Sequence, residues 1–255
     1  MRLEERRLLK LALVGGGVIA LIPVLYLTFL LVWGSSLTPR PTPSPTPAPP
    51  LINHALWARA GGGRATELRA VNPINVAGLV ICSNLNGGSD DAQSLDAEGL
   101  AECAKWLPAL HGLEYLSNLH GQDHQIQRAS FRGGASSMAT MLRLTYSWTR
   151  EEFLNTLAAQ ADLGYGWKGM EAAARGFFGR SAIDLTLAQS AFLASRVGDT
   201  QTDPWCEPAI ATAMRNRVLD RMRVNGAVSA ADSEAASAAE LDLAPPPEGR
   251  PPCGK

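Results

Sequence analysis

The sequence predicts a mainly α-helical domain that follows a single N-terminal transmembrane helix. Three observations support this fold class. A long uncharged run extends from Leu11 to Trp33. Thr149 and Thr186 each begin a pattern typical of a helix N-terminus, and apolar residues recur at helical spacing after Glu207-Pro208. We therefore expect short helices joined by glycine-rich turns.

The N-terminal run is long enough to cross about 30 Å of hydrocarbon as a helix. Four cations precede the run: Arg2, Arg6, Arg7 and Lys10. The next cation after it is Arg40, and because cytoplasmic flanks carry the positive charge, the rest of the chain should lie outside. We expect residues 1–10 to form a cytoplasmic stub and residues 11–33 an uncleaved anchor. A cleaved signal peptide is the alternative, although its apolar core is usually shorter and the residues at 32–34 make a poor cleavage site.

Composition divides the rest of the chain into three parts. Residues 34–50 contain TPRPTPSPTPAPP, whose alternating prolines favour an extended spacer that would lift the domain off the bilayer. Residues 51–225 are the expected folded domain. Residues 226–255 are rich in Ala, Ser and Glu and close on APPPEGRPPCGK, so we expect a disordered tail.

The four cysteines fit an exported domain. They are Cys82, Cys103, Cys206 and Cys253. Outside the cytoplasm they can pair in three ways, and four free thiols are the alternative. We favour a bridge between Cys82 and Cys103, which closes a short loop, and a second between Cys206 and Cys253, which would pin the tail back.

Charge and spacing argue against nucleic-acid and metal binding. The formal net charge of −1 gives no overall attraction to nucleic acid. The cysteines form no CxxC pair, and the four histidines, at 54, 111, 120 and 124, show no ligand spacing. Asp90 and Asp91 are interpreted as a solvated turn, because the alternating oxygen ligands of a calcium loop are missing. We expect no metal and no cofactor.

The first half of the domain gives two local predictions. The run VAGLVI, from Val76 to Ile81, is the most strand-like stretch, but it could equally be a buried helix turn. The stretch from Leu95 to Leu110 predicts a helix that ends near Pro108.

Helix boundaries are clearer in the second half. Thr149 with Glu152, and Thr186 with Gln189, fit capping boxes. Gly179 is expected to end a helix over 169–178. The helix that Glu207-Pro208 opens has one apolar face, formed by Ile210, Met214, Val218 and Met222. Four arginines lie elsewhere around it: Arg215, Arg217, Arg221 and Arg223. They could face lipid phosphate, but we expect them on a solvated flank.

An ordered series of motifs lies between Thr149 and Met222. Its segments are EFL at 152–154, LGYG at 163–166, GMEAAA at 169–174, FFGR at 177–180, LT at 185–186 and RVLDRM at 217–222. This series resembles the C-terminal half of the peptidoglycan glycosyltransferase (transglycosylase) family, which includes monofunctional enzymes and the first domain of bifunctional penicillin-binding proteins. The motif glycines and acid that carry the resemblance are Gly164, Gly166, Gly169, Glu171 and Gly179.

Upstream, the resemblance is partial. LHGQD at 119–123, Arg128-Ala129 and RGGASS at 132–137 stand where the family has H-x-G-x-D, a basic step and Q-G-G-S-T. The resemblance implies a lysozyme-like, two-lobed helical domain on the outer face of the bacterial cytoplasmic membrane, behind a membrane anchor. It also implies candidate substrate-binding residues: His120, Asp123, Arg128, Arg132, Ser136 and Ser137. Gly133 and Gly134 match the glycine pair of the motif.

The resemblance also implies a mechanism. In the family, a carboxylate acts as general base on a sugar hydroxyl that attacks a lipid-pyrophosphate-linked glycan. A second Glu and several cations stabilise the departing pyrophosphate, where negative charge builds up.

The catalytic groups are missing from the matching positions. The first Glu aligns with Gly112, or with Leu113 if one gap is allowed, and the second with Asn155. Glu114 is close, but an offset of one or two residues turns a helical side chain by about 100° to 200°. The basic helix that precedes the second Glu in the family is replaced by a short junction at Thr145-Tyr146.

Several candidates also have a structural interpretation. Glu171 more often fixes a helix start than takes part in chemistry, and Lys168 is expected to be exposed. Ser136 and Ser137 could cap a helix after the glycine turn. His120 and Asp123 could serve packing and loop bonding as readily as substrate contact.

Three functions follow from these residues. The first is a catalytically impaired glycosyltransferase-like protein that binds glycan, lipid-linked precursor or a cell-wall synthase. The second is a divergent active glycosyltransferase that uses Glu114 as base, with Arg128 and Arg132 at the leaving group. The third is lysozyme-like glycan cleavage, in which Glu114 with a raised pKa would protonate a glycosidic oxygen.

Overall fold

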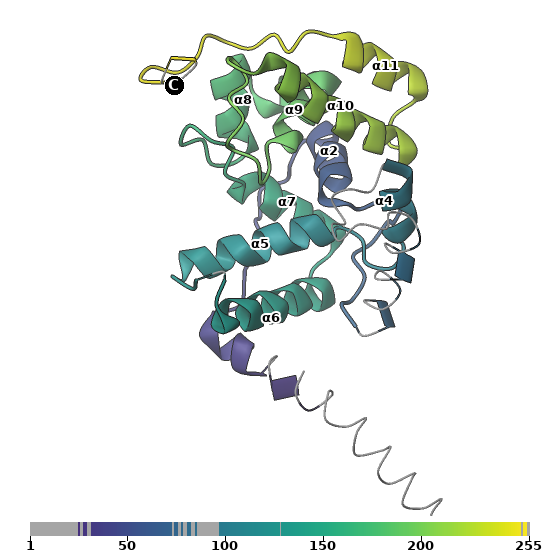
Figure 1. Ribbon diagram of the computed structural model, residues 1–255, viewed down its shortest axis with the longest axis vertical. Coiled ribbons are helices and arrows are strands. Elements are labelled where there is room, and N and C mark those ends of the chain that lie inside the picture. The colour runs from purple at the N-terminus through teal and green to yellow at the C-terminus, as the bar shows by residue number, and fades with distance from the viewer. Residues whose placement is uncertain are drawn as a thin grey trace, which may run out of the picture. The chain divides into compact units, whose positions relative to one another are not determined.

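The computed structural model of the chain describes residues 32–72, 97–127, 129–250 and 252–253, together with positions 25, 28, 29, 74, 75, 78, 81, 82 and 85 (Figure 1). Within these residues the protein is mainly helical. The β-structure of the described part is one isolated bridge between Asp162 and Lys168. The prediction of a mainly α domain is therefore confirmed.

The helices follow the chain in a simple order, labelled as in Figure 1. They are α2 (Pro50–Ala60), α4 (Ala97–Cys103), α5 (Leu110–Asp123), α6 (Phe131–Ser147), α7 (Arg150–Gln160), α8 (Met170–Phe178), the 3-10 helix η2 (Ala182–Asp184), α9 (Leu187–Ser195), α10 (Pro208–Val224) and α11 (Ala230–Ala238).

The chain divides into two compact units. Unit 1 contains Met1–Pro41 and Ser117–Met141, and unit 2 contains Thr42–Leu116 and Leu142–Lys255. Within unit 2, α9 packs against α2, α8 and α10. Every residue from Ala188 to Ser195 in α9 is buried, so this helix forms the centre of the unit 2 core. Phe177 of α8 meets Phe192 of α9 edge to face, with ring centroids 5.2 Å apart.

The two predicted capping boxes are confirmed. Thr149 Oγ1 accepts from the Glu152 N–H at 3.2 Å, and the Glu152 carboxylate accepts from the Thr149 N–H at 2.7 Å. Thr186 and Gln189 make the same reciprocal pair at the start of α9. Each box satisfies backbone donors that the first turn of a helix leaves without partners.

Glycine sets both ends of α8. Gly169 precedes the helix with φ +84°, and a β-carbon there would lie 2.8 Å from the Ala159 carbonyl oxygen. Gly179 ends it in the left-handed region, with φ +65°, as the sequence predicted. Gly164 and Gly166 also have positive φ. The motif glycines are thus positions where the backbone itself favours glycine.

The first half differs from its prediction. The helix expected over 95–110 ends at Cys103, in α4, and a turn region separates it from α5. Gly78 and Ile81 are helical, so the described positions of VAGLVI favour a helix turn over a strand. Asp90 and Asp91 lie outside the described residues.

Helix α10 begins at Pro208, directly after Glu207, as predicted. Its apolar face is buried only toward the C-terminus: Val218 and Met222 are inaccessible, whereas Ile210 is 49% exposed. Arg215 was expected on a solvated flank, and this was wrong, because its side chain is fully buried.

The tail explains the burial of Arg215. The Arg215 guanidinium donates to the carbonyl oxygens of Ser237 and Ala239, both at 2.6 Å. These carbonyls lie at the C-terminal end of α11, where unpaired oxygens attract a cation. Ser229 caps the other end of α11 by accepting from the Asp232 N–H at 3.1 Å.

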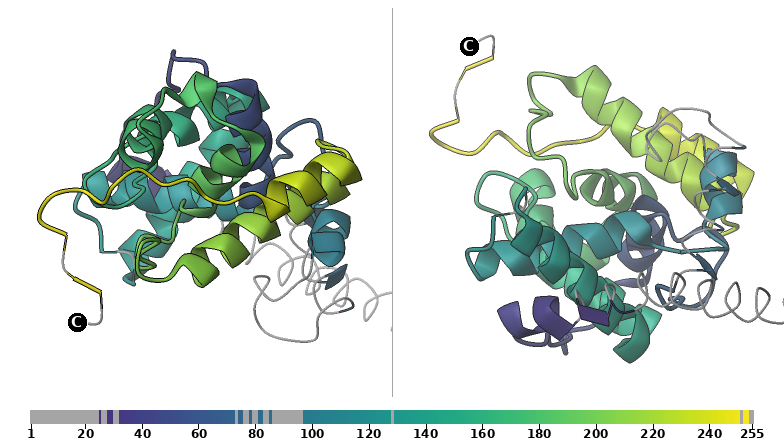
Figure 2. Two further views of the ribbon diagram at one scale, coloured as in Figure 1. Left: turned by 90° about the horizontal axis from the view of Figure 1, so that it is seen from above. Right: turned by 60° about the horizontal axis from the view of Figure 1, so that its bottom comes forward.

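Residues 226–255 therefore differ from the expected disordered tail. After α11 the chain returns across unit 2, as the yellow segment in Figure 2. The Ala244 N–H donates to the Phe177 carbonyl at 2.7 Å, and its own carbonyl accepts from Trp205 Nε1 at 2.9 Å. No apolar pattern in the sequence predicts this attachment, because backbone groups and one buried arginine make the contacts.

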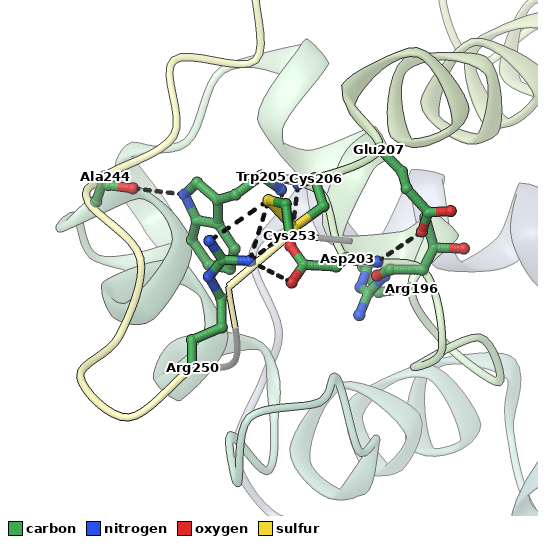
Figure 3. A network of polar contacts seen from close by, with 9 residues as sticks. Arg196, Asp203, Trp205, Cys206, Glu207, Ala244, Arg250 and Cys253 are labelled. Carbon is green, nitrogen blue, oxygen red and sulfur yellow. Dashed lines mark hydrogen bonds and ion pairs between the residues drawn. A yellow bond between two sulfur atoms is a disulfide. The ribbon is translucent and has the colours of Figure 1, made fainter. Parts of the chain in front are cut away.

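Both disulfides join the cysteines that the sequence analysis paired. Cys82 is bonded to Cys103, and Cys206 to Cys253. The second bridge lies in a polar cluster around Arg250 (Figure 3). Arg250 makes an ion pair with Asp203 at 2.6 Å and lies 5.8 Å from the Trp205 ring. Asp203 also accepts from the backbone N–H groups of Trp205 and Cys206.

No helix in the described part of the chain is both long and apolar enough to span a bilayer. The predicted anchor at 11–33 lies mostly outside that part, as does the predicted cytoplasmic stub. At the described end of the segment, Trp33 stacks on Phe131 of α6, with ring centroids 5.5 Å apart.

Removal of the tail bridge should loosen the C-terminus specifically. We expect the double variant Cys206→Ser/Cys253→Ser to lower the free energy of unfolding by ~2–4 kcal/mol, because the bridge restricts the unfolded chain. Urea denaturation measures this change, and hydrogen exchange at the Ala244 amide should become faster. In the control Cys82→Ser/Cys103→Ser, stability should fall without faster exchange at Ala244. An Ala244 amide that stays protected in the first variant would contradict the pinning role.

Candidate functional site

Gly112, which the sequence analysis aligned with the family's first Glu, lies in a closely packed position. Gly112 lies in the first turn of α5 and is buried. A β-carbon at this position would lie 2.7 Å from both the Ala60 Cβ of α2 and the Phe153 Cζ of α7. Leu113, the alternative alignment, is 0% exposed. Neither position offers a carboxylate, and a side chain at Gly112 would require Ala60 or Phe153 to shift.

Glu114 is the acidic residue next to these positions. It is exposed on α5, one residue beyond Leu113. Because each residue turns a helix by about 100°, its side chain points away from the direction that the buried Leu113 takes. Glu114 is thus an accessible carboxylate on a different face of the helix from the family position.

The position of the second Glu is used by the proline-rich segment. Asn155 of α7 is 7% exposed, and its Oδ1 accepts from the Ala48 N–H at 2.9 Å. The adjacent Thr156 Oγ1 accepts from the Ser44 N–H at 2.8 Å and donates to the Glu152 carbonyl at 2.7 Å. Residues 44–48 therefore lie along α7. The segment expected as a spacer is attached to the domain here.

The junction between α6 and α7 is short, but it lies at Trp148-Thr149 and not at Thr145-Tyr146, which are part of α6. Helix α6 ends at Ser147, the Trp148 N–H still donates to the Leu144 carbonyl at 3.0 Å, and Thr149 already caps α7. No room remains at this junction for a separate basic helix. The group of cations that precedes the second Glu in the family has no counterpart between these two helices.

In unit 1, the matched polar residues make local contacts. His120 Nε2 lies 3.0 Å from the Pro39 carbonyl oxygen, and its ring meets that of His124 edge to face. Asp123 ends α5 and is exposed. The contact to Pro39 fits the loop-bonding interpretation of His120.

The serines of the glycine motif lie inside a helix. Ser136 is 1% exposed, so it is not accessible to a substrate, and Ser137 shares a 2.7 Å hydrogen bond with Ser117. Neither caps a helix, which corrects that interpretation: the residue that serves the start of α6 is Ser130, whose Oγ accepts from the Gly133 N–H at 3.0 Å. Gly133 and Gly134 lie in the first turn of α6 and form no turn before it.

Of the two matched arginines, Arg132 is exposed at the start of α6. Arg128 lies outside the described residues.

Glu171 has a structural role in the motif. Its carboxylate accepts from the Ala182 N–H at 2.8 Å, from Arg175 Nε at 2.8 Å and from Ser181 Oγ at 3.2 Å. The Ala182 N–H is the main cause that holds its pKa below the ordinary value, helped by the hydrogen bonds from Arg175 and Ser181. Glu171 thus ties α8 to η2 as an ionised acceptor. Lys168 is exposed, as expected.

Among the described residues, no group of three or more His, Cys, Asp and Glu side chains lies close enough together to hold a metal ion.

The architecture defines a class before any comparison. Glycines with positive φ join short helices in this domain. Helix α8 carries GMEAAA and is tied to η2 by Glu171, and α10 carries RVLDRM. This order of elements is the one that the resemblance to the peptidoglycan glycosyltransferase family implies. Comparison with known proteins agrees. Residues 116–223 match the family model described as Transglycosylase, and the chain therefore carries a domain of the transglycosylase family.

Two curated proteins are similar to the chain. Penicillin-binding protein 1A of Streptococcus oralis is 27% identical over 169 residues, which cover 66% of this chain and 24% of that protein. Penicillin-binding protein 1A of Streptococcus pneumoniae (strain ATCC BAA-255 / R6) is 26% identical over 151 residues, which cover 49% and 21%. The chain thus spans less than a quarter of the length of these relatives.

The residues that sequence reasoning missed are those that hold the proline-rich segment. Proline alternation predicts an extended chain, but it does not indicate which helix that chain contacts. The bonds at Asn155 and Thr156 use backbone donors of Ala48 and Ser44, and every residue except proline carries such a donor.

Close packing at Gly112 can be tested by adding a single methyl group. We expect Gly112→Ala to lower the free energy of unfolding by ~1–3 kcal/mol, because the new Cβ overlaps Ala60 and Phe153. Chemical denaturation measures the change. The matched control is Gly121→Ala on the same helix, where a Cβ meets nothing within 4 Å; it should be neutral or stabilise by up to about 1 kcal/mol. Equal effects of both changes would contradict the close approach.

The attachment of the proline-rich segment can be dissected by hydrogen exchange. Asn155→Ala removes the acceptor of the Ala48 amide and should speed its exchange, while the Ser44 amide stays protected. Thr156→Val should do the reverse. Each lost bond is worth about 0.5–1.5 kcal/mol of local stability. If neither amide responds, the segment does not lie on α7 in solution.

Proposed function

We propose that this protein is a glycosyltransferase-like binding protein of cell-wall assembly that does not polymerise glycan. In this proposal it is held at the outer face of the bacterial cytoplasmic membrane by its N-terminal segment. The domain grips lipid-linked peptidoglycan precursor, with glycan strands or a cell-wall synthase as further partners. The proposal rests above all on Gly112, where the family's general base would stand.

The packing at Gly112 supports loss of the base. Proton abstraction needs a carboxylate within hydrogen-bond reach of the sugar hydroxyl. Ala60 Cβ and Phe153 Cζ would each lie only 2.7 Å from a β-carbon at this position, so no acid can be restored there without separating α5 from α2 and α7. The close packing at Gly112 involves side chains of two other helices, so a single substitution at this position does not relieve it.

The state of Asn155 supports the loss of the second acid. Its amide oxygen already accepts a hydrogen bond from Ala48, and its side chain is nearly inaccessible. An amide at this position cannot exchange a proton as a carboxyl group does. The residue now secures the proline-rich segment.

The short α6–α7 junction supports the loss of charge stabilisation. Departure of a pyrophosphate requires positive groups placed where negative charge develops. Two residues, Trp148 and Thr149, separate α6 from α7, so the cations that the family supplies there have no element to carry them. Binding of a precursor does not require these groups to the extent that its turnover does.

A divergent active enzyme is the second candidate. Glu114 is an exposed carboxylate two residues from Gly112 on α5, and it would serve as base. The lysozyme-like alternative depends on the same residue, as an acid. One substitution therefore tests both enzymatic hypotheses.

The experiment incubates the purified full-length chain, and the variant Glu114→Gln, with lipid-linked disaccharide precursor. We expect saturable binding of the precursor by both proteins and no glycan polymer from either. Binding is measured with a fluorescent precursor in detergent micelles, and polymer by gel analysis. An active bifunctional penicillin-binding protein serves as the positive control for the assay.

Other outcomes are equally informative. Polymer that forms with the wild-type chain and disappears with Glu114→Gln would establish the active-enzyme hypothesis and end the proposal. Release of soluble fragments from purified sacculi, again dependent on Glu114, would establish glycan cleavage. Absence of both binding and turnover would remove the precursor as ligand.

A further inference from the structure

A separate pocket lies in unit 2 beside α10. It has a volume of about 330 Å³, and its lining includes side chains from α2, the start of α5, the loop after α9, and α10. The charged and titratable lining residues are Arg59, His111, Asp199, Arg217 and Arg221. None of them occupies a position that matches the family's catalytic groups.

Positive charge dominates this pocket. Three guanidinium groups face one carboxylate, that of Asp199, which leaves a formal surplus of two positive charges. Arg217 and Arg221 are four residues apart on α10, and side chains at that spacing share one helix face. Arg59 comes from α2, and its Nη2 is fixed by the Val197 carbonyl at 2.8 Å.

The three arginines are not neutralised by nearby acids. Among the described residues, no carboxylate oxygen lies within 4 Å of a guanidinium nitrogen of these three arginines, so none of them forms an ion pair. Asp220, the acid closest to Arg221 in sequence, is paired with Arg223 at 2.6 Å and acts on Arg221 through its charge, without an ion pair. Asp199 acts on Arg59 through its charge, without a direct contact.

The electrostatic state of the pocket agrees with this description. Burial lowers the pKa of Arg221 to about 10, and repulsion from Arg59 and Arg217 adds to the effect. Burial, followed by the charges of Arg221 and Arg59, lowers the pKa of His111 to about 4. His111 is therefore neutral at pH 7 and adds no charge, but it keeps one N–H to donate.

Two other arginines of unit 2 have partners for their guanidinium groups, whereas the buried Arg196 donates to the Thr202 carbonyl and leaves Nε and Nη2 without a hydrogen bond. Arg215 donates to two carbonyls at the end of α11, and Arg250 pairs with Asp203. The group of three differs because its members converge on an open pocket. Like charges held together in a partly buried site destabilise the protein unless an anion compensates them.

We infer that this pocket binds a phosphate group between Arg59, Arg217 and Arg221. A phosphate or phosphate monoester carries about −1.5 to −2 charge at pH 7, which matches the surplus of two. Guanidinium groups bind its oxygens in planar, bidentate geometry. The volume exceeds that of one phosphate, so an attached organic group also fits.

The same chemistry has two sources, free phosphate compounds and lipid headgroups. The test uses the full-length chain with inorganic phosphate and pyrophosphate, measured by calorimetric titration at constant ionic strength. A second arm measures sedimentation with phosphatidylglycerol vesicles, with phosphatidylcholine vesicles for comparison. We expect saturable binding in at least one arm.

Two matched variants locate the binding. Arg217→Gln removes an exposed cation that lines the pocket and should weaken binding at least about tenfold, the effect expected from one lost hydrogen bond to a charged group. Arg223→Gln removes the same charge from the same helix outside the pocket and should change the affinity less than about twofold. In the wild-type chain, bound phosphate should also raise the pKa of His111, measured by NMR of labelled histidine, which requires no variant.

Soluble phosphate binding that Arg217→Gln weakens assigns the site to free phosphate compounds. Binding confined to phosphatidylglycerol vesicles, and weakened by the same variant, assigns it to a headgroup. Two results would overturn the inference: no binding in either arm, or binding that Arg217→Gln and Arg223→Gln reduce equally. Because the pocket shares no residue with the proposed precursor test at Glu114, either conclusion can fail alone.

Discussion

At Gly112, helix α5 lies so close to α2 and α7 that a β-carbon would come within 2.7 Å of Ala60 and Phe153. This approach fixes the start of α5, places Leu113 in the core and leaves Glu114 on the exposed side. The sequence analysis aligned Gly112 with the general base of the transglycosylase family, and here this position packs against α2 and α7. Packing and chemistry compete for this position, since buried space that excludes a methyl group also excludes a carboxylate.

Two segments stabilise unit 2 through polar contacts: one precedes the helical domain in the sequence and the other follows it. Before it, the backbone of residues 44–48 bonds to Asn155 and Thr156 of α7. After it, the tail satisfies buried Arg215 and is joined to the domain through Cys206–Cys253 and Arg250. Such bonds matter because a buried donor without a partner is costly. Asn155, which the sequence analysis aligned with the family's second Glu, holds the proline-rich segment here.

Charge in unit 2 is distributed unlike that of an acid–base site. The well-defined carboxylates, Glu171 and Asp203, are engaged by backbone N–H groups and by single arginines. Arg59, Arg217 and Arg221 instead gather at a pocket where one carboxylate stands against three guanidinium groups. The first arrangement holds helices together, and the second concentrates positive potential where a small anion can reach it.

The sequence by itself determined the helical class, the transglycosylase ancestry, the caps at Thr149 and Thr186, the stop at Gly179 and the paired cysteines. The caps and the helix stop depend on the backbone conformation of a few neighbouring residues, and the ancestry depends on the order of motifs along the chain. Only the tertiary structure decided that Gly112 is closely packed and that the proline-rich segment lies on α7. It also decided that Arg215 and the backbone at Ala244 hold the tail, and that three arginines share a pocket. Each of these depends on residues distant in sequence, and no periodic pattern records which backbone carbonyl or side chain will meet them.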